Sequence, residues 1–218
     1  MKYRLAAFDF DGTLADTLPW FESVMDGVAD KYGFRKASAA DKAQLRHRST
    51  REIMAFLEVP VWKLPAIMAH VRQLMREIDP AVRMFAGVPA ALAQLKAAGL
   101  RLAMCSSNSL DNVRRVLGPQ TGALIDDYEC GADLFGKPAK LARLMARHGV
   151  ERTRCILIGD EMRDIDAARK AGVMAGSVAW GYNHVDALRA RAPDEIFEQV
   201  TDLAAVLAPG FPSFPPTP

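Results

Sequence analysis

The chain has 218 residues, of which 50% are hydrophobic and 25% charged, a balance typical of a globular protein with a sizeable core. A net charge of +2, with no basic run interleaved with aromatic residues, gives no indication of nucleic-acid binding, and no apolar segment is long enough to span a membrane. Three widely spaced cysteines and an N-terminus without a signal-peptide pattern favour reduced thiols and a cytoplasmic location.

The first apolar run, Leu5 to Phe8, predicts a buried strand, and two carboxylates follow it, Asp9 and Asp11, just before Gly12. If the strand continued to Asp11, both side chains would share a face at the ligand-binding edge of a parallel sheet. Close carboxylates repel each other unless a cation or a shared proton intervenes, so the pair indicates Mg²⁺ or coupled protonation. One could attack phosphorus while the other moves protons. The alternative is two solvated aspartates before a turn.

A long helical region without strand signals follows. Apolar residues at helical spacing predict helices at Phe21–Tyr32, around Ile53–Leu57 and at Leu64–Ile78. Roughly seventy residues of helix are far too long for a simple connection after the first strand. The pattern therefore predicts an inserted helical domain, which we place at residues 17–85.

From Gly87 onward, helices and strands alternate. Further strands are expected at Leu100–Cys105, Tyr128–Cys130, Cys155–Ile158 and Val173–Val178, with a last helix at Thr201–Leu207. The alternation predicts an α/β fold: a doubly wound parallel, Rossmann-like sheet formed by residues 1–16 and 86–208. Residues 209–218 contain five prolines and are expected to be a disordered tail.

Polar residues at two further places should reach the same sheet edge as Asp9. Ser106, followed by Ser107, lies between a strand and a helix start, where a hydroxyl and backbone N–H groups suit a phosphate oxygen; the alternative is a helix cap. Lys137 lies at another helix start, where a cation opposes the helix dipole and requires an anion nearby. The alternative there is an ordinary surface lysine.

A second acidic cluster follows the fourth expected strand. Asp160 could complete an oxygen-ligated Mg²⁺ site with Asp9 and the backbone carbonyl of Asp11. Asp164, four residues later, could orient N–H groups, a metal-bound water or Lys137. The alternative is that these acids cap the following helix, which the helix dipole favours.

The order of these motifs resembles the four-motif signature of the haloacid dehalogenase (HAD) superfamily: Asp9-Phe10-Asp11-Gly12-Thr13, Ser106, Lys137, and Gly159-Asp160 with Asp164. The resemblance covers nearly the whole chain up to the proline-rich tail. The helical insert resembles the small cap of the phosphoglycolate phosphatase and β-phosphoglucomutase branch, and Asp16 and Thr17 match a polar pair typical of that branch.

The resemblance implies that Asp9 is the nucleophile and Asp11 the general acid/base, whose main-chain carbonyl binds the metal. Dehalogenases of the superfamily lack this second acid, so the resemblance favours phosphoryl transfer. It further implies roles at the other motif positions: Ser106 and Ser107 for phosphate binding, Lys137 for charge balance on the phosphorylated aspartate, Asp160 as metal ligand and Asp164 as partner of the metal or its water. Glu161 receives no role.

The expected function is that of a Mg²⁺-dependent phosphatase for a small phosphorylated metabolite, phosphoglycolate-like or a sugar phosphate. The cap should act as a lid, and Arg48 is the candidate specificity residue, with a solvated loop as the alternative. A sugar phosphomutase is the alternative enzyme, and a non-catalytic binding module the alternative of another kind. Neither the substrate nor the oligomeric state follows from the sequence.

Overall fold

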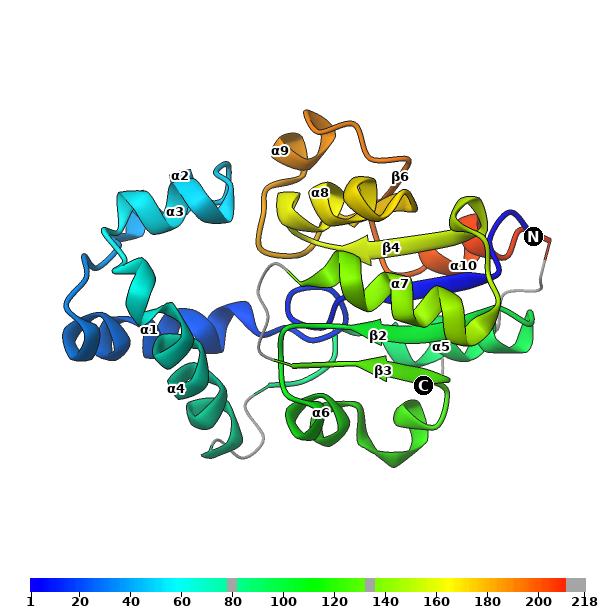
Figure 1. Ribbon diagram of the computed structural model, residues 1–218, viewed down its shortest axis with the longest axis horizontal. Helices are drawn as coiled ribbons and strands as arrows, with labels where there is room; N and C mark the ends of the chain where they lie inside the picture. Colours follow the sequence, from blue (N-terminus) through cyan, green and yellow to red (C-terminus); the bar gives the residue numbers. More distant parts are fainter. Residues whose placement is uncertain (78–81, 132–135, 211–218) are drawn as a thin grey trace.

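The computed structural model describes residues 1–77, 82–131 and 136–210. At its centre lies one parallel sheet of six strands in the order β3-β2-β1-β4-β5-β6 (Figure 1). The strands are β1 Leu5–Phe8, β2 Arg101–Cys105, β3 Asp127–Glu129, β4 Cys155–Gly159, β5 Met174–Val178 and β6 Glu195–Phe197. The first strand is central, because Phe8 is in register with Met104 of β2 and with Ile158 of β4. The predicted doubly wound α/β fold is confirmed.

Ten α-helices occur in the described residues: α1 Leu18–Tyr32, α2 Ala39–Leu45, α3 Thr50–Phe56, α4 Leu64–Glu77, α5 Val88–Ala97, α6 Leu110–Gly122, α7 Lys137–His148, α8 Met162–Ala171, α9 Val185–Arg189 and α10 Asp202–Leu207. Short 3₁₀ turns cover Val61–Lys63 and Arg152–Arg154. The sequence predictions missed α2, α9 and β6. The final residue of the predicted helix Leu64–Ile78 and most of the predicted tail, 209–218, lie outside the described residues.

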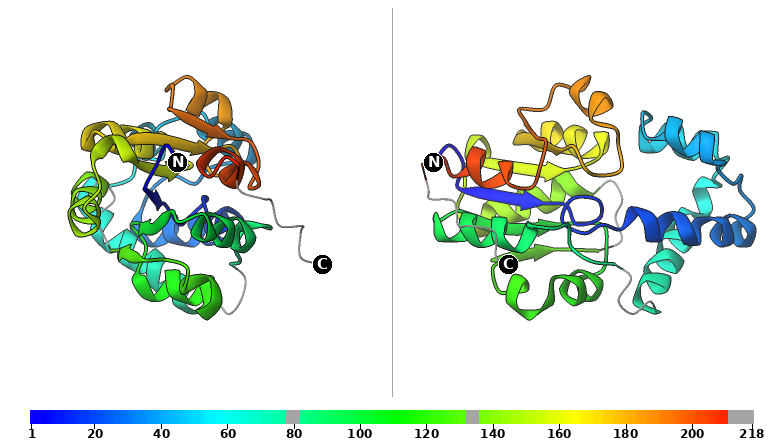
Figure 2. Two further views of the ribbon diagram at one scale, coloured as in Figure 1. Left: turned by 90° about the vertical axis from the view of Figure 1, so that its right-hand side faces the viewer. Right: turned by 180° about the vertical axis from the view of Figure 1, so that it is seen from behind.

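Helices cover both faces of the sheet (Figure 2). Side chains alternate between the two faces along β1, and each face packs against a different set of helices. Leu5 and Ala7 belong to a buried cluster with side chains of α7 and α8. Ala6 and Phe8 belong to a second cluster with side chains of α5, α6 and α10. Because both faces are buried, the strand is apolar throughout and is held firmly in register.

Helices α1 to α4 lie beyond the C-terminal ends of the strands, with α1 against α4 (Figure 1). They lie between β1 and β2 in the chain, where the sequence predicts an inserted domain. We refer to them as the cap and to the sheet with its flanking helices as the core. The boundaries at residues 17 and 85 remain our proposed division.

The first strand is shorter than the alternation argument required. It ends at Phe8, and the chain then turns, with the N–H groups of Leu14 and Ala15 both donating to the Phe10 carbonyl. Gly12 occupies the left-handed region within this turn, with a φ of 72°. The condition that placed Asp9 and Asp11 on one face of a continuous strand is therefore not met, because a tight turn takes Asp11 out of the sheet.

No single helix in the described chain has both the length and the apolar character needed to cross a membrane; only the bent pair Thr50–Phe56 and Val61–Glu77 reaches them in combination. Cys105 and Cys155 are buried, Cys130 is half-buried, and all three thiols are free.

Candidate active site

The C-terminal edge of the sheet brings together residues that lie far apart in the sequence. Asp9 follows β1, Ser106 follows β2 and Asp160 follows β4, while Lys137 begins α7 and Asp164 lies in the first turn of α8. All five side chains are buried, with at most 2% of their surface exposed. Five polar or charged groups withdrawn from water in one place require mutual compensation or a ligand.

Lys137 compensates two of these carboxylates. Its Nζ lies 2.5 Å from Oδ2 of Asp9 and 2.5 Å from Oδ1 of Asp164. Burial alone lowers the pKa of Lys137, but the two carboxylates outweigh it and raise the pKa above its usual value. Burial alone raises the pKa of Asp164, but the positive charges of Lys137 and Arg163 outweigh burial and lower the pKa below its usual value. The predicted need for an anion beside Lys137 is met twice.

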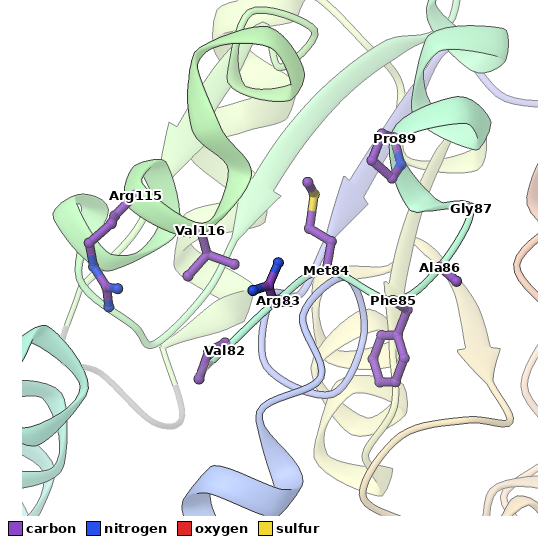
Figure 3. Close-up of a pocket in the computed structure, with 9 residues that line it drawn as sticks. All are labelled: Val82, Arg83, Met84, Phe85, Ala86, Gly87, Pro89, Arg115 and Val116. Carbon is purple, nitrogen blue, oxygen red and sulfur yellow. The ribbon is translucent and has the colours of Figure 1, made fainter. Parts of the chain in front are cut away.

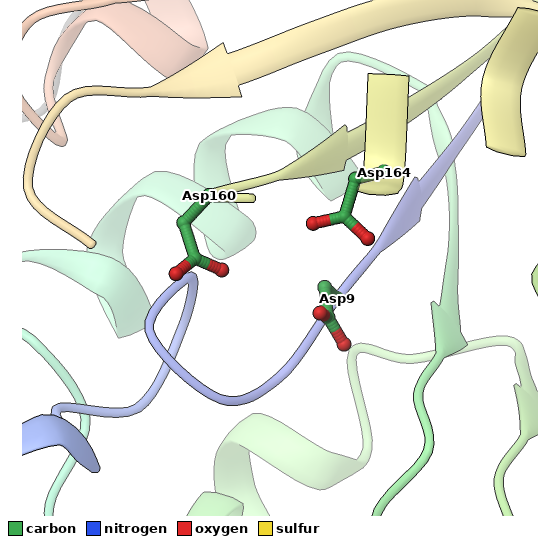
Figure 4. Close-up of side chains that lie close together, drawn as sticks. All are labelled: Asp9, Asp160 and Asp164. Carbon is green, nitrogen blue, oxygen red and sulfur yellow. The ribbon is translucent and has the colours of Figure 1, made fainter. Parts of the chain in front are cut away.

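The three aspartates form a cluster suited to a cation (Figure 4). Asp9, Asp160 and Asp164 each place a carboxylate oxygen within 4.8 Å of the others. Burial raises the pKa of Asp160 well above its usual range, and the charges of Glu161, Asp164 and Asp9 raise it further. One lysine and one arginine cannot neutralise so many carboxylates, and hard oxygen donors are the ligands that Mg²⁺ prefers. The residues present therefore fit a magnesium ion.

The carboxylate of Asp160 is held in a fixed orientation. Oδ1 accepts a hydrogen bond from the Thr13 hydroxyl at 2.8 Å, and Oδ2 accepts one from the Tyr182 N–H at 2.8 Å. A Cβ at Gly12 or at Gly181 would overlap this carboxylate, so the chain can approach it only where both residues lack a side chain. The sequence indicated no role for Tyr182, and it contained Thr13 only as part of the first motif, without a contact to Asp160.

Asp11 lies apart from this cluster. Asn108 donates from Nδ2 to both of its carboxylate oxygens, at 3.1 Å each. Burial, followed by the charge of Asp9, raises the pKa of Asp11 to about 7, although the Asn108 hydrogen bonds act in the opposite direction. A carboxyl group with a pKa near neutrality can give up and take back a proton. The predicted contact of the Asp11 carbonyl with a metal stays a prediction.

A second lysine of α7, Lys140, holds the backbone of the loop that follows β2. Ser106 Oγ accepts a hydrogen bond from the Asn108 N–H at 3.0 Å. The N-cap of α6 is Ser109, so the helix-capping alternative for Ser106 is wrong. Lys140 Nζ, itself buried, donates to the Ser106 carbonyl at 2.6 Å and to the Gly131 carbonyl at 3.0 Å. Only the spacing of three residues from Lys137 on one helix could have pointed to Lys140. Ser107 is buried beside Ser106 and lines a cavity.

That cavity, of about 320 Å³, lies between the cap helices and the site. Asp11, Ser107 and Asn108 line its inner end, and its wall consists mostly of apolar side chains of α1, α3 and α4. A second pocket, of about 530 Å³, lies elsewhere, lined by residues 82–87, Pro89, Arg115 and Val116 (Figure 3). None of the predicted site residues lines this second pocket, whereas Asp11 and Ser107 line the cavity between the cap helices and the site.

The cap is joined to the core by hydrogen bonds around Asn183. Its Nδ2 donates to the carbonyls of Arg46 and Arg48, at 2.9 and 3.0 Å. In return, Arg46 Nη2 donates to the Gly181 carbonyl at 2.8 Å, and Nε donates to the Tyr182 carbonyl at 3.1 Å. The loop after β5 therefore contacts the cap on one side and Asp160 on the other.

Glu161 and Arg48 also lie at this junction. Glu161 accepts a hydrogen bond from the Thr50 hydroxyl of the cap at 3.0 Å. The Arg48 guanidinium lies over the Phe56 ring, 5.1 Å from its centroid, whereas its neighbours Arg46 and Thr50 line the cavity. The specificity role of Arg48 stays a prediction.

Comparison with known proteins places this arrangement in a family. The family model for haloacid dehalogenase-like hydrolases matches residues 6–178. A phosphoglycolate phosphatase of Synechococcus elongatus is 35% identical over 197 residues, which cover 90% of this chain and 93% of that protein. A phosphoglycolate phosphatase of Yersinia pestis is 29% identical, covering 96% and 94%.

Solved structures agree in fold. A predicted phosphatase from Clostridium acetobutylicum superposes with a TM-score of 0.76 at 18% identity, covering 93% of this chain and 97% of that one. CbbY from Rhodobacter sphaeroides, solved in complex with phosphate, gives 0.67 at 20% identity, covering 92% and 96%.

The chain belongs to the haloacid dehalogenase-like hydrolase family. Within that family it is a phosphatase, a hydrolase of phosphoric monoesters.

Proposed function

We propose that the protein is a Mg²⁺-dependent phosphatase that hydrolyses a small phosphorylated metabolite through an aspartyl phosphate on Asp9. The observation that carries the proposal is the position of Lys137 between Asp9 and Asp164, 2.5 Å from each. A nucleophilic carboxylate needs its charge balanced before a phosphate dianion can approach, and a buried lysine does this at no cost of rearrangement. Free thiols support a cytoplasmic setting for the enzyme.

In the first step a carboxylate oxygen of Asp9 attacks phosphorus, and the bond from phosphorus to the ester oxygen breaks. The ester oxygen leaves with a proton from Asp11, whose pKa of about 7 allows it to act as an acid near neutrality. Water then attacks phosphorus and gives its proton to Asp11, which releases inorganic phosphate and restores Asp9. Asn108 keeps the Asp11 carboxylate oriented between the two steps.

The phosphoryl oxygens would be held by Ser106, Ser107 and Lys137. Asp9, Asp160 and the Asp11 carbonyl would hold Mg²⁺, with Asp164 beside it. The bound ion would supply positive charge against the negative charge that accumulates on the transferring phosphoryl group.

Phosphoglycolate is the first substrate to test, because proteins named phosphoglycolate phosphatase are similar to this chain over nearly its whole length. Sugar phosphates are the second group. The mutase alternative uses the same core groups but returns the phosphoryl group to the substrate. The binding-module alternative is disfavoured by the complete set of buried polar groups.

The test is phosphate release from a panel of phosphorylated metabolites, with Mg²⁺ or with EDTA, by wild type and by Asp9→Asn. We expect release that requires both Mg²⁺ and Asp9. Asp166→Asn, an exposed acid of α8 outside the site, serves as the matched control and should retain wild-type turnover.

Equal turnover by wild type and Asp9→Asn would rule out the covalent mechanism. Isomerised sugar phosphate without net phosphate release would identify a mutase. Arg48→Ala, assayed on the same panel, tests its proposed role: unchanged kcat/KM for every compound would remove Arg48 from the specificity residues.

A further inference from the structure

The cavity beneath the cap is the place for the organic part of a substrate, because Asp11, which would protonate the ester oxygen, lines its inner end. Most of the wall is apolar, with Phe21, Ile53 and Met68 among the lining side chains. In such surroundings a charged group is poorly hydrated, and its interaction with an opposite charge is strong. The cations of the wall therefore determine which anions the cavity accepts.

Six cationic side chains line the cavity among the described residues, and five of them already have partners. These five are Arg35 with Asp41, Lys36 with Asp30, Lys42 with Glu22, Arg46 with the carbonyls of Gly181 and Tyr182, and Arg163 with Glu161. Their charge or their donors are already engaged within the protein.

Arg72 is the sixth. Its Nη1 is buried, and within residues 1–77, 82–131 and 136–210 it has no hydrogen-bond partner. Burial lowers the pKa of Arg72, and the neighbouring cation Arg76 lowers it further. A buried guanidinium nitrogen without an acceptor is costly, and a ligand that supplies the acceptor removes that cost.

The position of Arg72 places it on the wall close to the reacting groups. It precedes Met75 by three residues, about one turn of α4. Met75 Sδ lies 3.1 Å from Asn108 Nδ2, which holds Asp11. The backbone of Arg72 is fixed as well, because its carbonyl accepts a hydrogen bond from Asn112 at 3.2 Å.

Resting on the proposed phosphatase activity, we infer that Arg72 is a specificity residue that binds a carboxylate carried by the alcohol part of the substrate. A guanidinium presents paired donors that match the two oxygens of a carboxylate. The substrate class is then a phosphate monoester with a second anionic group close to the ester oxygen. An alcohol part without charge would leave Nη1 without an acceptor.

The test compares two esters that differ only in the carboxylate, phosphoglycolate and ethyl phosphate, with wild type and three variants. We expect Arg72→Gln to lower kcat/KM for phosphoglycolate roughly 10- to 100-fold and to leave ethyl phosphate nearly unchanged. Arg72→Lys keeps the charge and should retain part of the preference. Arg76→Gln removes the same charge from an exposed position one turn later and should change neither value.

Two results would overturn the inference. Equal losses for both esters in Arg72→Gln would show a structural role, and a wild-type preference for ethyl phosphate would show that the cavity selects uncharged alcohols. If Arg72→Gln alone failed to fold, Arg72→Lys would decide. A lower preference for phosphoglycolate with turnover of ethyl phosphate retained would support the inference, and an unchanged preference would overturn it.

Binding of non-hydrolysable analogues distinguishes a failure of the Arg72 inference from a failure of the phosphatase proposal. The phosphonates 3-phosphonopropionate and propylphosphonate copy the shapes of the two esters, and calorimetry with Mg²⁺ gives their Kd values. Roughly tenfold or tighter binding of the carboxylate-bearing analogue, lost in Arg72→Gln, supports the inference even if no ester is hydrolysed; in that case it is the phosphatase proposal that fails. Equal Kd values in wild type overturn the inference whatever the turnover.

Discussion

Asn108 donates from one amide nitrogen to both carboxylate oxygens of Asp11, at 3.1 Å each, and its own oxygen accepts from Asn112 at 3.0 Å. Because the Asn108 oxygen accepts this hydrogen bond from Asn112, the nitrogen of the Asn108 amide faces Asp11. The carboxyl group to which we assign the proton transfers therefore has its orientation set by a second residue.

We predict that Asn108→Ala lowers kcat about tenfold or more, because Asp11 then loses the group that orients it. Thr121→Ala is the matched control: it removes a buried polar side chain near the far end of α6. Each variant should lose about 1–3 kcal/mol in the free energy of unfolding, but only Asn108→Ala should lose activity beyond that. Steady-state kinetics and urea unfolding of both proteins measure this, and an equal loss of kcat in the two would contradict it.

Replacement of Lys137 should affect stability as well as activity. In Lys137→Met two buried carboxylates remain side by side without their cation, so we expect turnover to be abolished and the free energy of unfolding to fall by about 3–5 kcal/mol. Lys170→Met, at an exposed position of α8, should stay within about 0.5 kcal/mol of wild type. Chemical denaturation compares the two, and equal stabilities would refute the compensating role of Lys137.

Gly181 offers a test of the Asp160 position without changing a charged residue. In Gly181→Ala the added methyl group overlaps the Asp160 carboxylate, so we expect the Mg²⁺ concentration for half-maximal activity to rise at least tenfold. The control is Gly27→Ala, a helical position with open space, where a gain in stability of roughly 0.5–1 kcal/mol is expected. If the Mg²⁺ activation curve of Gly181→Ala matched that of wild type, the assignment of Asp160 as a metal ligand would be wrong.

Asp126 gives a pH-dependent contribution to stability. Burial raises its pKa, but hydrogen bonds from Lys96 and from the Leu102 N–H outweigh this and lower the pKa below its usual value of 3.8. A group whose pKa is lower in the folded state stabilises the fold above its unfolded pKa and loses that effect as pH falls through the folded value. We expect Asp126→Asn to cost about 1 kcal/mol at pH 7, a small value because the ion pair is partly exposed and screened.

The same difference should shrink as the pH falls below about 4, since the wild-type carboxyl group is then protonated too. Unfolding by urea at several pH values measures it. Asp111→Asn, an exposed acid at the start of α6, is the control. A difference that grew on acidification would reverse the sign assigned here.

The fold could be predicted because its strands are apolar on both faces and are separated by long periodic helices. Shorter elements escaped prediction for a physical reason. The three residues of β6 form a strand because Ala179 N–H donates to the Phe197 carbonyl and the Asp194 carboxylate accepts from Ala175 N–H. The local sequence contains neither partner. For α2 a local signal existed, the capping box of Ser38 and Asp41, and it was overlooked.

The candidate site divides in a similar way. Residues that follow strands, such as Asp9 and Asp160, could be placed at one edge by topology alone. Their supporting residues could not: Asn108 lies 97 positions from Asp11, and Tyr182 lies 22 positions from Asp160 in a loop without a motif. These contacts depend on side-chain conformation and on loop paths that composition and periodicity do not specify.

Arg46 acts on Asp160 through two consecutive peptide groups. The peptide between Gly181 and Tyr182 accepts Arg46 Nη2 on its carbonyl and donates its N–H to the Asp160 carboxylate; the next peptide accepts Arg46 Nε and donates to the Asp160 carbonyl at 3.3 Å. Each peptide group is planar and rigid, so Arg46 binds its carbonyl oxygen on one side while Asp160 binds its N–H on the other. A cation at the carbonyl oxygen also polarises the peptide group and makes its N–H a stronger hydrogen-bond donor. If the cap closes as the lid that we predict, its docking would also fix the orientation of Asp160, so that closure of the lid and ordering of the proposed metal ligand would occur together.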